Sequence, residues 1–332
     1  MLNDPTANVA GWAANVAAAS RTTEGNMALV VVGSVAIDSI RTPFGEMNEG
    51  LGGSATYFSA AAGFLCHPQL VAIVGEDFDL HELDFLRERG VDLSTVRTVE
   101  GKTFRWKGVY EDLNEAKTLA TELNVFQNFA PELNDAQRDA EVVFLANIQP
   151  TLQLSVLDQV RKPRFVAADT MNLWIQSARE PLLEVLRRVD MIVINEGEAR
   201  MLADERNTIS AAKKIRDMGP RVVVIKRGEF GALLFHEDRF FFAPAVPLET
   251  VLDPTGAGDS FAGGFMGSIA CASCINDDSL RRGVIAGTVM ASFAVQGFGL
   301  QRMRTLSSAE VQARYSALCE MMRFDHAPLA LA

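Results

Sequence analysis

The chain has 332 residues, of which 48% are hydrophobic and 22% are charged, and its formal net charge is −11. This composition is typical of a soluble globular protein, and the negative balance argues against a nucleic-acid partner held by general electrostatics. No run of about eighteen apolar residues occurs, and residues 1–26 do not read as a secretory signal, so we expect no membrane span and a cytoplasmic protein.

Short apolar strands alternate with helices along most of the chain. Strands are predicted over residues 29–32, 71–74, 142–145, 165–168, 191–194 and 222–225, and helices over 53–64, 80–89, 152–160 and 181–188. Continuous apolar strands indicate a sheet covered on both faces. Their alternation with helices indicates parallel strands joined by right-handed crossovers. We therefore predict an α/β fold with a mostly parallel central sheet.

Two regions depart from this alternation. Residues 103–110 alternate and carry aromatics, as a half-exposed strand does, and 118–123 could pair with them. With a strand over 39–47, they predict a small β lid formed by segments near 38–50 and 95–125. We expect one domain over 28–325, a poorly ordered extension over 1–27 and a tail over 326–332.

Polar residues follow several predicted strands directly. Asp169, Asn195 and Lys226 each stand where an apolar run ends, and Asn147 lies shortly after another. In an open parallel sheet, ligands bind at the carboxyl ends of the strands. These side chains are therefore expected to face one crevice.

A short glycine-rich segment then precedes an apolar helix. Gly256, Ala257 and Gly258 place backbone N–H groups at the positive end of that helix, a ready site for phosphate oxygens. Asp259 follows directly and is suited to take a proton from a hydroxyl that attacks phosphorus. The alternative is an Asp/Ser helix cap behind an ordinary glycine turn.

The whole segment over 253–264, Asp-Pro-Thr-Gly-Ala-Gly-Asp-Ser-Phe-Ala-Gly-Gly, resembles the C-terminal signature of the ribokinase-like (PfkB) carbohydrate kinases. Three further motifs resemble that family in its order: Gly-Leu-Gly-Gly-Ser-Ala-Thr over 50–56, Asn-Glu-Gly-Glu over 195–198 and Lys-Arg-Gly-Glu-Phe-Gly over 226–231. The resemblance implies a three-layer α/β sandwich with a β lid. It also implies ATP-dependent transfer of the γ-phosphate to a hydroxyl.

The resemblance assigns roles to residues on the acceptor side. Asp38, Gly52 and Gly53 match the positions that hold substrate hydroxyls, and a carboxylate can accept hydrogen bonds from two vicinal hydroxyls. Asn147 and Asp169 stand where further substrate contacts are made.

On the nucleotide side, the resemblance implicates Asn195, Lys226, Gly228 and Gly231. Asn195 and Glu198 would steer Mg²⁺ through water, although the same letters also fit an N-capped helix with an acidic first turn. The remaining pair, Asp253 and Thr255, lies where many relatives bind a monovalent cation such as K⁺, largely through backbone carbonyls.

The sequence motifs specify the reaction more closely than they specify the phosphate acceptor. We expect a sugar with a primary alcohol. The alternative is a nucleoside, because Thr56-Tyr57-Phe58 lacks the Asn that many sugar-binding relatives carry there. A second alternative is a catalytically idle relative that only binds a sugar or nucleotide. A homodimer formed through the lid is a further expectation.

Overall fold

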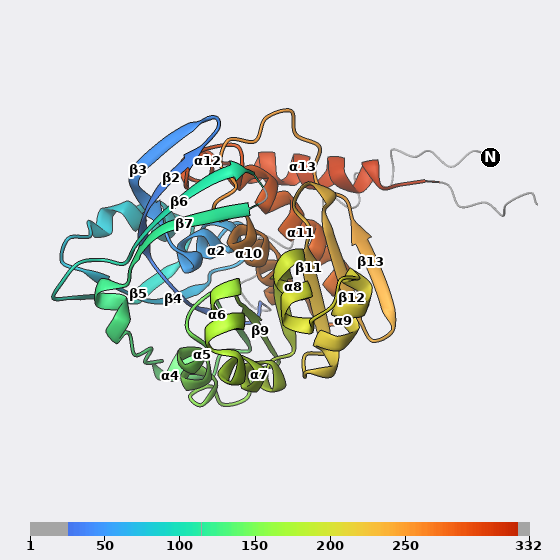
Figure 1. Cartoon of the computed structure of the whole chain (residues 1–332), viewed down its shortest axis with the longest axis horizontal. Helices are drawn as coiled ribbons and strands as arrows, with labels where there is room; N and C mark the ends of the chain where they lie inside the picture. The colour runs from blue at the N-terminus through green and yellow to red at the C-terminus, as the bar shows by residue number, and fades with distance from the viewer. Residues whose placement is uncertain (1–25, 114, 325–332) are drawn as a thin grey trace, which may run out of the picture.

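A computed structural model of the chain describes residues 26–113 and 115–324. One large sheet is covered by helices on both faces, and a second, small sheet stands at its side (Figure 1). The predicted three-layer α/β sandwich with a small β lid is confirmed. No helix in these residues has both the length and the hydropathy needed to cross a bilayer.

The large sheet has the strand order β13-β12-β11-β10-β9-β8-β1-β4-β5. Its strands are β1 (Leu29–Val32), β4 (Gln69–Gly75), β5 (Asp92–Val99), β8 (Val142–Leu145), β9 (Phe165–Asp169), β10 (Met191–Asn195), β11 (Val222–Lys226), β12 (Ala232–His236) and β13 (Arg239–Ala243). Neighbouring strands are parallel, except that β12 is antiparallel to both β11 and β13. Each strand predicted from an apolar run is present.

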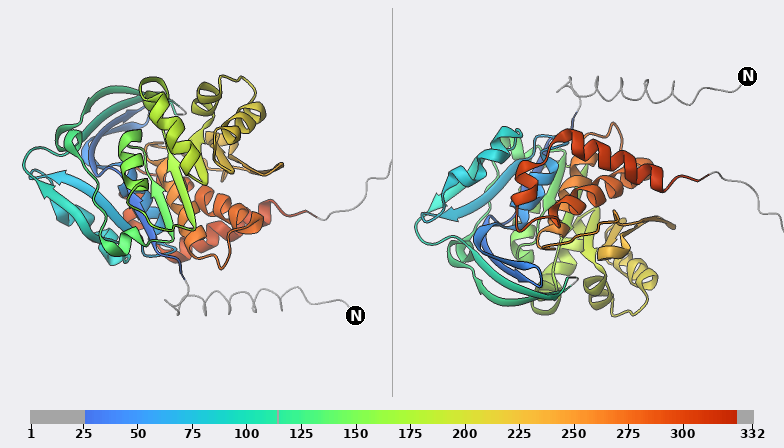
Figure 2. Two further views of the ribbon diagram at one scale, coloured as in Figure 1. Left: turned by 90° about the horizontal axis from the view of Figure 1, so that it is seen from below. Right: turned by 90° about the horizontal axis from the view of Figure 1, so that it is seen from above.

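The strands carry apolar side chains on both faces, so a layer of helices packs on each face of the large sheet. In β1, Leu29 and Val31 join one core while Val30 and Val32 join the other, and all four are fully buried. Figure 2 shows the orange and red helices of the last part of the chain together on one face of the sheet, with the yellow and olive helices on the other.

The first face is covered by α2 (Ser54–Ala62), α3 (Asp84–Glu88), α10 (Ala257–Ala270), α11 (Asp277–Ala294), α12 (Gln301–Thr305) and α13 (Ser308–Met321). The second is covered by α5 (Pro150–Leu157), α6 (Asn172–Ser177), α7 (Arg179–Arg188), α8 (Glu196–Ala203) and α9 (Thr208–Asp217). Short elements complete the chain: η1 (Leu80–Leu83), η2 (Asn124–Asn128), α4 (Asp135–Arg138) and η3 (Gly228–Phe230). The single helix predicted over 80–89 is thus a 3₁₀ turn followed by a short α-helix, α3.

Helix α10 is held by backbone-to-backbone contact with its neighbours. A Cβ at Gly263 would overlap the Phe58 carbonyl oxygen of α2, and one at Gly264 would lie 2.7 Å from the Ala286 carbonyl oxygen of α11. Only glycine permits such a close approach. The packing therefore fixes where the N-terminus of α10 lies.

The small sheet, called the lid below, has the order β3-β2-β6-β7. Its strands are β2 (Ala36–Thr42), β3 (Gly45–Gly52), β6 (Arg105–Asp112) and β7 (Glu115–Glu122). The single strand predicted over 39–47 was wrong, because the chain turns after Thr42 and forms a hairpin. The predicted lid segment 95–125 also starts too early, since residues up to Val99 belong to β5 and pair with β4 in the large sheet.

The predicted extension ends earlier than expected. Met27 is buried in the core, and its amide donates a 2.8 Å hydrogen bond to the Ala270 carbonyl at the end of α10. Met27 therefore belongs to the folded body. Residues 1–25 and the predicted tail over 326–332 lie outside the described residues.

Candidate active site

A cavity of about 210 Å³ opens at the carboxyl ends of β9, β10 and β11. The residues that line it come from the segments after β8 and β9, from the ends of β9, β10 and β11, and from the first turns of α8 and α10: Asn147, Asp169, Thr170, Met171, Asn195, Glu198, Lys226, Gly258 and Asp259. The sequence-based expectation that the polar strand-end residues face one crevice is confirmed.

Asp259 lies in the first turn of α10 and faces this cavity rather than the protein interior. The helix is preceded by Gly256, whose φ of 73° is in the left-handed region that favours glycine. A Cβ at Gly256 would also overlap the ring of Tyr57 in α2. The glycine turn thus sets the direction in which α10 presents its first residues.

The three residues predicted to bind phosphate through their amides are not equivalent. The Ala257 N–H donates a 3.2 Å hydrogen bond to the Pro254 carbonyl and closes the turn, so its predicted role in anion binding is corrected. The Gly258 N–H makes no hydrogen bond within the part of the chain that the structure describes, and neither does the Gly256 N–H. The available anion site is therefore these two amides at the start of α10, and we call residues 253–258 the anion loop.

Lys226, at the end of β11, lies against this loop. Its Nζ is 3.3 Å from Asp169 Oδ2, and the two side chains are 17% and 5% exposed. A Cβ at Gly258 would lie 2.7 Å from the same Nζ. Burial lowers the pKa of Lys226, but the carboxylates of Asp169, Glu198 and Asp259 raise it above its ordinary value. Lys226 is therefore a charged cation beside the anion site.

The neighbouring Arg227 points elsewhere. Its Nε donates to Glu196 Oε1 at 3.2 Å, and Arg227 is not among the residues that line the cavity. Of the two basic residues in this motif, Lys226 is the one placed to meet a phosphate.

Two carboxyl groups of the site, those of Asp259 and Glu198, resist ionisation. Burial raises the pKa of Asp259 from 3.8 to about 8, and the Asp169 carboxylate adds to the rise. Burial also raises the pKa of Glu198 to about 7, against the opposing effect of Lys226. A desolvated cluster of this kind is typical of catalytic sites and of sites that receive a cation.

Asp38, Gly52 and Gly53 lie together beside the cavity. Burial raises the pKa of Asp38 to about 7, although the Gly53 N–H donates a hydrogen bond to its carboxylate. A Cβ at Gly52 would overlap Asp38 Oδ2, and Gly53 has a φ of 99°. The Asp38 charge is close enough to raise the pKa of Asp259, so these residues are neighbours of the site although they do not line the cavity.

A Gly52→Ala variant should lose affinity for the phosphate acceptor. The added Cβ displaces the Asp38 carboxylate, so we expect KM for the acceptor to rise by about tenfold or more, the order of one lost hydrogen bond to a charged group. Gly50→Ala is the matched control, because its Cβ would meet only the flexible Met47 side chain. Equal acceptor KM values in the two variants would contradict the assignment of Asp38 to the acceptor side.

Several predicted ligand residues already have protein partners. The Asn147 Oδ1 accepts from Trp174 Nε1 at 2.9 Å, and Asn195 and Glu198 form a reciprocal capping box at the start of α8. The expected N-cap is thus present. Asn195 and Glu198 nevertheless both line the cavity. Gly228 and Gly231 form the η3 turn outside it, where a Cβ at Gly231 would overlap the Ala243 carbonyl.

The side chains of Asp253 and Thr255 are committed as well. Asp253 accepts from the Thr255 N–H at 2.9 Å and from the Gly299 N–H at 2.8 Å, and the Thr255 hydroxyl donates to Tyr110 Oη at 3.2 Å. A monovalent cation here would depend on backbone carbonyls. Within residues 26–113 and 115–324, no group of three or more His, Cys, Asp or Glu side chains is arranged to hold a metal ion.

Thr170 and Met171 directly follow Asp169 at the end of β9. Both line the cavity, and Thr170 Oγ1 is buried without a hydrogen-bond partner among the described residues. A buried hydroxyl is normally hydrogen-bonded. The orphaned oxygen therefore indicates a ligand or water at this position.

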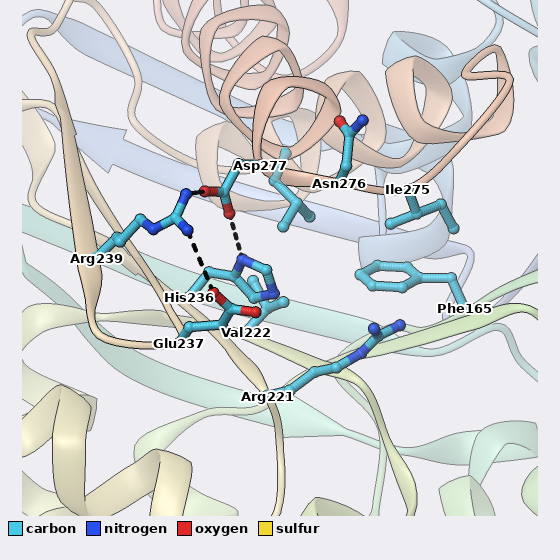
Figure 3. A pocket seen from close by; sticks show the side chains of 10 residues that line it. Phe165, Arg221, Val222, His236, Glu237, Arg239, Ile275, Asn276 and Asp277 are labelled. Atoms are coloured by element: carbon cyan, nitrogen blue, oxygen red, sulfur yellow. Dashed lines mark hydrogen bonds and ion pairs between the residues drawn. The ribbon is translucent and has the colours of Figure 1, made fainter.

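A larger cavity of about 400 Å³ lies at the amino ends of the parallel strands of the large sheet (Figure 3). Phe165 and Val222, the first residues of β9 and β11, line it. Figure 3 shows His236 and Arg239 pointing toward Asp277, to which both are bonded. Because its charged groups are paired and it lies away from the carboxyl ends of the parallel strands, it is not the candidate active site.

Comparison with known proteins identifies the family of the chain. The family model of the pfkB family carbohydrate kinases matches residues 26–306. A cytidine kinase of Thermococcus kodakarensis is 32% identical over 245 residues, which are 72% of this chain and 87% of that protein. A 2-dehydro-3-deoxygluconokinase of Thermoproteus tenax is 27% identical over 234 residues, 65% of this chain and 71% of that protein.

Solved structures show the same fold. A nucleoside kinase of Burkholderia thailandensis in complex with inosine superposes with a TM-score of 0.70 at 21% identity, covering 88% of this chain and 98% of that one. The match of the family model over most of the chain leads to one conclusion. The chain belongs to the pfkB family of carbohydrate kinases, the ribokinase-like phosphotransferases with an alcohol acceptor.

Proposed function

We propose that this kinase transfers the γ-phosphoryl group of ATP to the primary hydroxyl of a nucleoside, with Asp259 as the general base. The observation that carries the proposal is the juxtaposition of Asp259, the Gly258 amide and Lys226 at one cavity. A base, an anion site and a cation in contact supply the positioning and electrostatic stabilisation that phosphoryl transfer requires.

Each residue has a defined part in the reaction. Asp259 accepts the proton of the acceptor hydroxyl as that oxygen attacks phosphorus. The Gly256 and Gly258 N–H groups and the dipole of α10 stabilise the negative charge on the transferring group. Lys226, now paired with Asp169, neutralises the phosphate oxygens from the strand side. Asp38 orients the acceptor hydroxyls.

Mg²⁺ fits this site as a partner of the phosphates rather than of a protein cage. The carboxylates of Glu198, Asp169 and Asp259 surround the cavity, but no set of three is arranged as metal ligands in the described chain. Asn195 and Glu198 would therefore hold the ion through water. When bound, Mg²⁺ neutralises charge on the phosphoryl group. Dependence on K⁺ stays a prediction, as does dimerisation through the lid.

Two observations favour a nucleoside over the free sugar that the sequence motifs first suggested. The cytidine kinase relative shares 32% identity over most of its own length, and Thr56-Tyr57-Phe58 lacks the Asn of many sugar-binding relatives. The second candidate is a sugar acid or related sugar. It is supported by the 2-dehydro-3-deoxygluconokinase relative and by the polar lining of the cavity.

A coupled assay of ADP release tests the proposal. Cytidine, inosine, adenosine, ribose and 2-dehydro-3-deoxygluconate are offered as acceptors at equal concentration, with ATP and Mg²⁺. We expect the highest kcat/KM with one of the nucleosides. A preference for either sugar would replace the nucleoside by the second candidate. If none of the five acceptors supports ADP release, a catalytically idle relative would be favoured.

The pH dependence should report the buried base. Because Asp259 must be ionised and its pKa lies at about 8, kcat/KM should fall about tenfold per pH unit below pH 8. The measurement is a kcat/KM profile between pH 5.5 and pH 9.5, and a flat profile from pH 6 upward would contradict this role.

A further inference from the structure

Two strands of the lid contact residues 252–255, at the start of the anion loop, through side-chain hydroxyls. Thr42, the last residue of β2, is 6% exposed, and its Oγ1 donates a 2.8 Å hydrogen bond to the Leu252 carbonyl. Tyr110 in β6 is 9% exposed, and its Oη accepts from Thr255 Oγ1 at 3.2 Å. Both bonds join parts of the chain that are far apart in sequence, so they are tertiary contacts between the lid and residues 252–255.

The same four residues are held from the opposite side by the segment after α11. The Leu252 N–H donates to the Val295 carbonyl at 2.8 Å, and Asp253 Oδ2 accepts from the Gly299 N–H at 2.8 Å. Residues 252–255 therefore lie between the lid and the main body and are bonded to both. They lead directly into Gly256 and the first turn of α10.

Helix α2 closes a third side. The Tyr57 ring lies so close to the Gly256 Cα that no Cβ could be added. Close packing of this kind leaves little room for a shift toward α2. The lid covers the remaining side of these residues, and its two hydroxyl contacts are the bonds that a displacement of the lid would break.

We propose that Thr42 and Tyr110 are positioning residues that couple the place of the lid to the geometry of the anion loop. The proposal rests on the proposed function, since the loop matters because its amides and Asp259 act on the phosphoryl group. When the lid covers the acceptor, the two bonds hold residues 252–255 and so align Gly256, Gly258 and Asp259. When the lid opens, both bonds are lost and the amides are less well fixed.

Coupling of this kind links acceptor binding to catalysis without a contact between Thr42 or Tyr110 and the reacting atoms. A kinase must keep water away from the phosphoryl group until the acceptor is in place. If the anion loop is aligned only under a closed lid, ATP bound alone is held in a less reactive geometry. The expected consequence is slow ATP hydrolysis in the absence of acceptor.

Hydrogen exchange in the ligand-free protein tests the physical coupling. The variants are Tyr110→Phe, Thr42→Val and their combination, and peptides covering residues 252–260 are followed. We expect exchange there to be about 3- to 10-fold faster in each single variant, as one lost hydrogen bond predicts, and faster again in the combination. Thr42→Ser keeps the hydroxyl and should exchange like the wild type.

Tyr315→Phe is the matched control, because it removes a tyrosine hydroxyl from α13, outside the lid and the candidate site. Unchanged exchange over 252–260 in the double variant would overturn the proposal. So would an equal increase in Tyr315→Phe, since that would reflect general loss of stability. Circular dichroism melting of every variant confirms that the proteins compared are folded. If Thr42→Val does not fold, Tyr110→Phe alone decides the test, because it removes the contact with Thr255.

Steady-state kinetics then separate positioning from a structural role. In the double variant we expect kcat to fall by about tenfold or more with little change in the KM for ATP, and the ratio of ATP hydrolysis to phosphoryl transfer to rise. A rise in KM alone, with kcat unchanged, would overturn the positioning role. If the wild type phosphorylates no acceptor, the proposed function fails, while the exchange experiment, which uses no nucleotide, still decides whether the lid and the loop are coupled.

Discussion

An Asp259→Asn variant is expected to lose a factor of about 10²–10⁴ in kcat, the usual contribution of a positioned general base. The amide has nearly the same shape as the carboxylate and keeps its place in the first turn of α10, but it cannot accept the proton of the acceptor hydroxyl. ATP binding should change only modestly, because the Gly256 and Gly258 amides and Lys226 remain. Turnover is measured by ADP release and affinity for ATP by calorimetry.

The matched control is Asp278→Asn. Asp278 is an exposed acid in the first turn of α11, so it tests the loss of a carboxylate at a helix N-terminus away from the cavity. We expect wild-type turnover from it. Full activity in Asp259→Asn would remove Asp259 from the proposed role.

The Asp259→Asn variant should also be more stable than the wild type at alkaline pH. The pKa of Asp259 is about 8 in the folded protein against an ordinary 3.8, so the folded state holds a proton that the unfolded chain releases. The carboxyl group's contribution to stability is therefore complete below about pH 4 and is lost as the pH rises to 8. Asparagine does not titrate, so melting at pH 8.5 should occur about 2–4 °C above the wild type, with no difference at pH 4.

A Lys226→Met variant should show the second large effect. It removes the cation beside the anion loop and is expected to lower kcat/KM by about 10²–10³, comparable to the loss of one group that stabilises transition-state charge. It also leaves the buried Asp169 carboxylate without its ion-pair partner. Breaking a buried pair in this way typically destabilises a protein by about 3–5 kcal/mol, which urea unfolding would detect.

A double variant separates these two consequences. Adding Asp169→Asn to Lys226→Met removes the stranded charge, so stability should return toward the wild type while kcat/KM stays low. Recovery of activity together with stability would mean that Lys226 acts only as a structural partner of Asp169. Arg227→Met, whose guanidinium is bonded to Glu196, should lower kcat/KM by about threefold at most.

The large sheet could be predicted because its strands are continuous apolar runs, which a strand buried on both faces requires. The edge strand β5 and the lid hairpin could not be placed in the same way. In β5 most side chains are exposed or half-buried, so its sequence resembles a lid strand, and β2 and β3 are separated only by a short turn after Thr42. In both cases the pairing partner, and not the local pattern, decides the structure.

The site could be predicted from the sequence where its chemistry is local. Asp259 and Gly258 are adjacent, and Asp169, Asn195 and Lys226 each end an apolar strand of one sheet. The sequence did not predict that the Ala257 N–H is hydrogen-bonded to the Pro254 carbonyl, because this bond depends on how the turn after Pro254 closes. Thr42 and Tyr110 carry no local signal, because their partners lie 210 and 145 positions away.

The central claim is that Asp259 and the anion loop deliver a phosphoryl group to an alcohol and not to water. It is tested most directly with ATP labelled with ¹⁸O in the γ-phosphate, followed by mass spectrometry of the products from wild type and Asp259→Asn. We expect the wild type to place the label in the phosphorylated nucleoside and the variant to do so at least about a hundredfold more slowly. Label found only in inorganic phosphate, or equal rates in the two proteins, would contradict it.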